Sequence, residues 1–213
     1  NKEGTIIAYN TGYGSSNSEE KVIVQEWNPS SNCGQGGWEQ KGGNIGTGSS
    51  NDKFGNFMDM NDDGTIIVIG AYDTDDKGRI YVYEWNPSSN CGQGGWEQRG
   101  STITNPSGDD FAEIQKVGGR VCINSDGTFI VSMFEVTNTM GGATHVFCVW
   151  EWNPSSNCGQ GGWEQKGDFN YSNDRKYNDQ ISFHEHSDGP KISDDGMYIF
   201  IPEYRHDTGN NKN

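Results

Sequence analysis

The sequence predicts an all-β fold. Short apolar runs alternate with turns rich in Gly, Asn and Asp, and no apolar pattern of helical period is long enough to form a helix. The hydrophobic fraction is only 31%, yet aromatic residues make up 12% of the chain and supply the burial that a core needs. A chain of 213 residues is long enough to bury such a core.

A recurring turn divides the chain into repeats. "NKEGTIIAYN", "NDDGTIIVIG", "NSDGTFIVSM" and "SDDGMYIFIP" each place a tight turn before an apolar run. The turn glycines are Gly4, Gly64, Gly127 and Gly196, separated by 60, 63 and 69 residues. This drifting period indicates insertions in loops, and it gives repeats at approximately 1–50, 51–108, 109–175 and 176–213, the last one partial.

The second repeat predicts four strands. Phe54–Met60 is short and rich in small residues, and a turn of the Asp-Gly kind follows it. Thr65–Ala71 is continuously apolar and β-branched, so we expect burial on both faces. Gly78–Trp85 alternates and is expected to be half-buried, whereas Gly95–Ile103 is polar and suits an outer edge. Four such strands are typical of one β-propeller blade.

The register of the repeats predicts a segment with two open ends. The chain enters at the second strand of one blade and leaves after the second strand of another, giving about three complete blades where a closed propeller has about four to eight. Open ends present a blade face or edge that needs covering. Because the chain also starts at Asn1 without a leader or Met, we expect residues 1–213 to belong to a larger propeller or a longer chain.

The second repeat resembles a known motif. Phe54-Gly55, followed by a strand, a turn and Gly70-Ala71, resembles the FG-GAP repeat of integrin-α-type propellers, with Tyr72 in place of Pro. The wider pattern looks like repeats of large secreted or surface proteins of algae, other protists and large viruses. The third repeat departs from the motif at Phe111-Ala112. The resemblance implies propeller architecture and a surface location, but no particular activity.

The resemblance also implies a possible calcium site in the first turn of the second repeat. Asp59, Asn61 and Asp63 match the opening of the calcium loop of FG-GAP proteins, in which oxygen ligands alternate before a Gly. Ile67 stands where that loop has its last Asp. The alternative is an ordinary Asp-Gly hairpin without metal.

A segment of fifteen residues, "EWNPSSNCGQGGWEQ", is identical at Glu26–Gln40, Glu84–Gln98 and Glu151–Gln165. We call each copy a cassette. Pro, Asn, Ser and Gly are turn formers, so one interpretation is a turn unit copied by recent duplication. The other is a multivalent surface for carbohydrate or a repeating protein partner, in which weak contacts add. The candidate binding residues are Trp27, Asn32, Gln35, Trp38, Trp85, Asn90, Gln93, Trp96, Trp152, Asn157, Gln160 and Trp163.

Each cassette carries one cysteine: Cys33, Cys91 and Cys158. Equivalent loops on successive blades should lie too far apart for a disulfide between them. These cysteines are therefore free or bonded outside the segment, and in a secreted protein bonds to other chains are favoured. Cys122 and Cys148 lie on predicted strands and are expected to be buried.

Composition argues against several functions. A net charge of −15 disfavours nucleic acid and anionic membranes as partners, and no apolar run is long enough to span a bilayer. No nucleophile motif is present, and we expect His184 and His186 to lie on a polar strand or loop rather than to bind metal or catalyse. Asn170 begins the one glycosylation sequon that lacks Pro.

We therefore expect a non-enzymatic extracellular structural or adhesive protein that contributes to a cell-surface or virion assembly through repeated loop contacts. The alternative is a calcium-assisted receptor module that binds glycans or proteins. No cofactor other than calcium is indicated.

Overall fold

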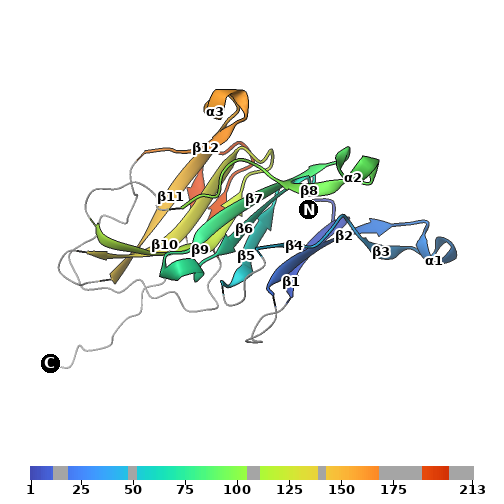
Figure 1. The fold of residues 1–213 in the computed structure, drawn as a ribbon, viewed down its shortest axis with the longest axis horizontal. Coiled ribbons are helices and arrows are strands. Elements are labelled where there is room, and N and C mark those ends of the chain that lie inside the picture. Colours follow the sequence, from blue (N-terminus) through green and yellow to red (C-terminus); the bar gives the residue numbers. More distant parts are fainter. Residues whose placement is uncertain (12–18, 48–51, 105–110, 139–142, 168–188, 202–213) are drawn as a thin grey trace.

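The computed structural model describes residues 1–11, 19–47, 52–104, 111–138, 143–167 and 189–201. These residues form antiparallel sheets that follow one another in chain order (Figure 1). The all-β prediction is therefore confirmed, and the four-stranded sheets are consistent with propeller blades. No helix in the described part of the chain is long and apolar enough to cross a membrane.

The first sheet contains β1 (Ile6–Thr11), β2 (Lys21–Asn28), β3 (Gly37–Gln40) and β4 (Ile45–Gly46). The second contains β5 (Phe54–Met60), β6 (Ile66–Ala71), β7 (Arg79–Asn86) and β8 (Gly95–Gln98). The third contains β9 (Phe111–Ile123), β10 (Phe129–Asn138), β11 (Ala143–Asn153) and β12 (Gly162–Gln165). A last hairpin joins β13 (Lys191–Ile192) and β14 (Ile199–Phe200). β1 and β14 each follow a repeat turn, so they correspond to the second strands β6 and β10 of the complete sheets.

A side-chain oxygen at the start of each repeat turn closes the hairpin. In the second repeat, Asn61 Oδ1 accepts hydrogen bonds from the backbone N–H groups of Thr65 (3.0 Å) and Ile66 (2.8 Å). Asn1 and Asn124 make the equivalent pairs of bonds. These turns recur because a short amide side chain satisfies N–H groups that the tight turn leaves without a strand partner.

Two apolar clusters lie on the two faces of the second sheet. Ile67 and Ile69 face the first sheet, whereas Ile66 and Val68 face the third. All six residues of β6 are buried, which confirms the predicted burial on both faces. The prediction that the strand at β7 is half-buried was wrong for its first half, because Tyr81 on the second face is only 9% exposed. The first sheet covers that face.

The predicted outer edge strand, Gly95–Ile103, is interrupted. β8 ends at Gln98, and Ile103 rejoins the sheet through two backbone hydrogen bonds to Ile80, of 3.0 and 2.9 Å. The first sheet repeats this arrangement, since β3 and β4 both pair with β2. The intervening residues leave the ladder and reach the next sheet, as described below.

The second and third sheets approach closely at Gly70. A Cβ on this residue would lie 2.0 Å from the carbonyl oxygen of Gly118 on β9. Gly78 makes a similar approach, and a backbone bridge joins it to Val117. This backbone contact explains the glycine in the Gly-Ala part of the repeat motif, because a larger residue at that position would clash with β9.

Candidate functional site

The three cassettes adopt the same conformation at the ends of three hairpins (Figure 1). In the first, Trp27 on β2 lies opposite Trp38 on β3, with ring centroids 5.5 Å apart in an edge-to-face arrangement. The pairs in the second and third cassettes are 5.5 and 5.3 Å apart. The two tryptophans that bracket the loop therefore pack against each other in every copy.

One glutamate fixes the start of each loop. Asn28 Oδ1 accepts the N–H of Ser30 at 2.9 Å, and its Nδ2 donates to Glu39 Oε2 at 2.9 Å. Ser31 Oγ donates to the other carboxylate oxygen of Glu39. These donors, Ser31 first and Asn28 second, hold the pKa of Glu39 below its usual value. Glu97 and Glu164 have equivalent partners and a lowered pKa.

The loop tip is left-handed. Asn32, Cys33 and Gly34 have φ values of 50°, 57° and 87°, so the short segment α1 (Ser31–Gly34) is not a right-handed helix. Asn32 Nδ2 donates to the carbonyl of Gly36 at 2.8 Å, which closes the loop. A non-Gly residue in this conformation costs about 1–2 kcal/mol, and Asn tolerates it better than most. The segments α2 (Ser89–Gly92) and α3 (Ser156–Gly159) repeat these values.

The fold explains most of the cassette, but not all of it. The Asn, Ser, Glu and Trp side chains make the contacts described above, and the glycines allow positive φ or close packing. The side chains of Cys33 and Gln35 are instead exposed, and neither has a hydrogen-bond partner among the described residues. The tip of each cassette is therefore the part that remains open to a partner.

Four of the six cassette tryptophans lie in contacts between sheets. Trp96 Nε1 donates to the carbonyl of Lys41 at 2.9 Å, and Trp163 Nε1 donates to that of Arg99 at 3.0 Å. Sequence reasoning missed this use of the tryptophans. Its signal is the Lys-Gly or Arg-Gly pair that follows every cassette, in "EQKGG", "EQRGS" and "EQKGD".

A cleft lies between the second cassette and the edge of the first sheet. Its volume is about 250 Å³. Its polar and aromatic lining includes Asn44, Tyr83, Asn90 and Trp96. Two of these, Asn90 and Trp96, are residues that the sequence suggested for binding. Amide groups beside aromatic rings are chemically suited to a sugar or a short peptide.

All five cysteines lie in the described part of the chain, and none is in a disulfide. Cys33, Cys91 and Cys158 are exposed, and Cys122 and Cys148 are buried as expected. Burial raises the pKa of the Cys122 thiol to about 12. The structure contains no disulfide between two cassette cysteines.

The candidate calcium ligands already serve the fold. Asp59 accepts the N–H of Ile123 at 3.0 Å, and its burial raises its pKa. Asp63 Oδ1 accepts hydrogen bonds from the N–H and the hydroxyl of Thr65, at 2.9 and 2.6 Å. Burial alone would raise the pKa of Asp63, but the hydrogen bonds together outweigh burial, and the pKa is lower than usual. Among the described residues, no group of three His, Cys, Asp or Glu side chains is placed to hold a metal. A calcium ion would have to compete with these hydrogen bonds.

His184, His186 and Asn170 fall outside the described residues.

No curated protein matches the chain. One family model, described as the FG-GAP repeat, matches residues 46–83. That segment runs through β5 and β6 and most of β7, the strands that carry Phe54-Gly55 and Gly70-Ala71. Residues 46–83 of this chain are thus similar to an FG-GAP repeat.

Proposed function

We propose that the chain is a non-enzymatic structural or adhesive repeat protein that works outside the cell, as part of a cell-surface or virion assembly. One observation carries the proposal: three identical loop tips project from successive hairpins, each with an exposed Cys and Gln that the fold does not use. A tip repeated in this way binds a repeating partner through several weak contacts at once.

The partner that fits these tips is another protein chain. In an oxidising compartment an exposed cysteine forms disulfides, and three at equivalent positions would link one chain to several neighbours. Each of these cysteines is exposed on the left-handed part of its loop, where a neighbouring chain can reach it.

The test is the light-scattering mass of native material with and without reductant. We expect a large species that falls to single chains on reduction, and that is absent from the triple variant Cys33→Ser, Cys91→Ser, Cys158→Ser. The matched control replaces the exposed serine beside each tip: Ser30→Ala, Ser88→Ala, Ser155→Ala. A single-chain mass in both conditions would rule out covalent assembly through the cassettes.

The cleft beside the second cassette favours a second candidate, a calcium-assisted module that binds glycans or proteins. Its aromatic and amide lining is the supporting observation. Glycan-array binding that is lost on Asn44→Ala would support a ligand in this cleft, and loss on chelation would support the calcium. Binding that survives chelation would leave a glycan receptor without calcium, and no binding to any glycan would count against both.

A further inference from the structure

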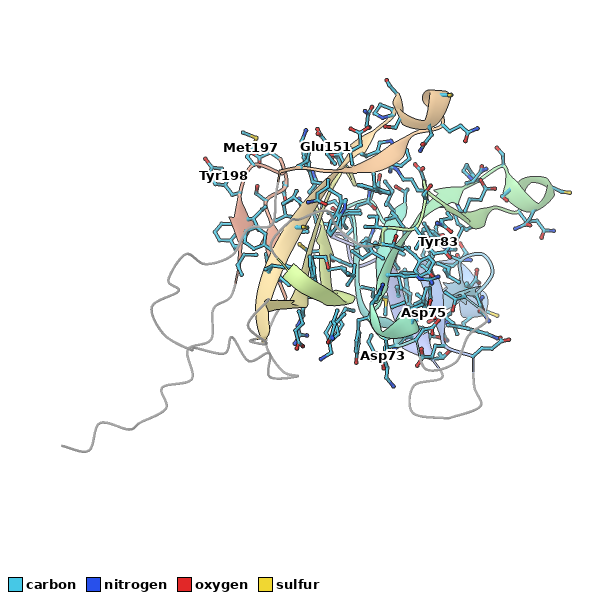
Figure 2. The ribbon with its side chains drawn as sticks, turned by 60° about the vertical axis from the view of Figure 1, so that its left-hand side comes forward. Asp73, Asp75, Tyr83, Glu151, Met197 and Tyr198 are labelled. Carbon is cyan, nitrogen blue, oxygen red and sulfur yellow. The ribbon has the colours of Figure 1, made fainter. Side chains whose placement is uncertain are left out.

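The cleft beside the second cassette is lined by described residues of two neighbouring sheets. The first sheet contributes the stretch Gly43–Gly46, and the second contributes Tyr83 of β7 and part of the cassette. Figure 2 shows Tyr83 where the second hairpin meets the first sheet. None of these described lining residues is charged, although the chain has a net charge of −15. The cleft therefore suits an uncharged ligand, because a charged group would leave water without an opposite charge to pair with.

Trp96 forms a fixed apolar wall of this cleft. Its Nε1 donates to the carbonyl of Lys41 at 2.9 Å, and its ring packs edge-to-face on Trp85 with centroids 5.5 Å apart. Because its one polar atom is already used, Trp96 offers only ring carbons to a ligand. On the side of the first sheet, a Cβ on Gly43 would meet nothing within 4 Å, so the space there is open. A ligand can thus lie against the indole without displacing the first sheet.

Three polar groups that line the cleft have no partner among the described residues. Asn44 Oδ1 accepts Gln40 Nε2 at 2.9 Å, which leaves the Asn44 Nδ2 as a donor. Asn90 Nδ2 donates to the carbonyl of Gly94 at 2.8 Å, which leaves the Asn90 Oδ1 as an acceptor. Burial raises the pKa of Tyr83, so its hydroxyl keeps its proton and can donate or accept. A donor, an acceptor and a group that does both therefore line one cleft.

These features fit a sugar better than a peptide. A sugar ring combines an apolar C–H face with several hydroxyls that each donate and accept, so it can pack on Trp96 and satisfy all three polar groups. An extended peptide is held mainly by main-chain hydrogen bonds at a strand edge, whereas the groups identified here belong to side chains. The volume of about 250 Å³ is below the roughly 300–1,000 Å³ of sites for drug-sized ligands, which limits the ligand to about one ring.

The equivalent place between the second and third sheets has different side chains on the edge strand. Thr102 Oγ1 accepts Gln98 Nε2 at 3.1 Å, so Thr102 stands where the first sheet has Asn44. Ser101 accordingly stands in place of Gly43. The open glycine and the amide donor of the first sheet are therefore both missing from the second sheet.

The wall formed by β7 differs as well. Tyr83 lies opposite the last residue of the second cassette, and Trp150 of β11 lies opposite the last residue of the third. Trp150 is only 3% exposed and has no hydroxyl to offer. Of the two contacts between cassette-bearing sheets in the described chain, the first thus has the combination of groups that a sugar requires.

We propose that the cleft between the first and second sheets binds one neutral sugar residue. Trp96 packs against a C–H face of the ring, and Asn44, Tyr83 and Asn90 bond to its hydroxyls. The described lining contains no carboxylate, so this binding uses no calcium at the cleft. The inference rests on the second candidate function proposed above, and it narrows the ligand of that cleft to a neutral sugar bound without metal. It does not depend on assembly through the cassette cysteines.

Saturation-transfer NMR on the native chain tests the proposal, with EDTA and reductant present. The probes are the methyl glycosides of glucose, galactose, mannose and N-acetylglucosamine. We expect at least one of them to bind with a Kd of about 1 mM, as suits a site for a single ring. The double variant Gly43→Ser, Asn44→Thr should raise that Kd about tenfold or more, because it narrows the cleft and removes the amide donor. Tyr83→Phe should raise it about two- to tenfold, as loss of one hydrogen bond implies.

The second sheet supplies the controls. The double variant carries the residues that the second sheet has at the same places, so its urea midpoint should equal that of the native chain. The reciprocal variant Ser101→Gly, Thr102→Asn should leave the Kd unchanged, because it alters the same two positions away from the cleft. Methyl glycosides of glucuronic acid and sialic acid test the preference for a neutral ligand, and should bind at least about tenfold more weakly.

Several results would overturn the proposal. They are the absence of binding by any neutral glycoside, a Kd that the double variant does not change, and acidic glycosides that bind as tightly as neutral ones. Binding that appears only when calcium replaces EDTA would refute the metal-free site and leave the second candidate function intact. The same holds if acetylated and amidated neutral tripeptides bind in place of the glycosides. If neither class of probe binds, with or without calcium, the second candidate function fails as well.

Discussion

Two glycines of the second cassette separate backbone strain from side-chain packing. Gly92 and Gly94 have φ values of 86° and 81°, so alanine is strained at either position. Their surroundings differ, however. A Cβ on Gly92 meets nothing within 4 Å, whereas a Cβ on Gly94 would lie 2.2 Å from Cζ2 of Trp85. The comparison of Gly94→Ala with Gly92→Ala therefore isolates the packing of the tryptophan.

The expected losses of stability follow from these surroundings. The positive φ costs about 1–2 kcal/mol in both variants. Overpacking adds about 1–3 kcal/mol only at Gly94, because Trp85 must move and weaken its contact with Lys41. We thus expect free energies of unfolding lowered by about 1–2 kcal/mol for Gly92→Ala and about 2–5 kcal/mol for Gly94→Ala.

Urea unfolding followed by tryptophan fluorescence measures both values, provided that the m-value stays the same in each variant. The near-ultraviolet circular dichroism should change only for Gly94→Ala, since only that change displaces an indole. Equal destabilisation of the two variants would show that Trp85 is not held against Gly94, and would contradict the packing described for every cassette.

Three further predictions concern the turns, the carboxylates and the thiols. Asn124→Ala should lower the free energy of unfolding by about 1–3 kcal/mol or more, because the N–H groups of Thr128 and Phe129 lose their acceptor. Asn124→Ser keeps a hydroxyl acceptor of the kind that Ser193 supplies in the fourth turn, and it should recover part of the loss in the same urea assay. The pKa of Glu97 is lowered by Asn86 first and Ser89 second, so its contribution to stability is present above its usual value of 4.5 and is lost as the pH falls through the lowered value. The difference in urea midpoint between the native chain and Glu97→Gln should therefore shrink on acidification below pH 4.5, and a constant difference would refute this assignment. A thiol reagent should modify Cys33, Cys91 and Cys158 rapidly, but Cys122 and Cys148 only after unfolding; five fast thiols would contradict their burial.

Local patterns allowed much of the fold to be predicted. The Asp-Gly turns and the apolar runs after them are local signals, and β5, β6 and β7 begin within one residue of their predicted starts. The tryptophan pairs were also predictable, because the two residues bracket one hairpin. In each case the sequence neighbours that carry the signal are also neighbours in space.

Contacts between repeats could not be predicted in this way. The outer edge strand breaks after Gln98 because Arg99 and Gly100 reach Trp152, more than fifty residues further along the chain. Tyr81 is buried by a different sheet for the same reason. The left-handed tip was equally hidden, since Asn90 and Cys91 adopt positive φ in a loop that Asn90 closes by a hydrogen bond to the carbonyl of Gly94.

The structure divides each identical cassette into two parts with different consequences for mutation. The tryptophans of the second and third cassettes contact the neighbouring repeat. Trp96→Ala should therefore destabilise the fold, but by less than the roughly 3–5 kcal/mol that loss of a fully buried aromatic side chain costs, because Trp96 is only partly buried. The tip faces away, so Gln93→Ala should leave the urea midpoint unchanged.

If the cassettes were identical only because the fold demands it, the tip would be the part free to vary. It has not varied in any of the three copies. A Gln35→Ala, Gln93→Ala, Gln160→Ala variant with native stability but weakened assembly would show that the tips are retained for a partner, whereas native assembly would leave recent duplication as the explanation.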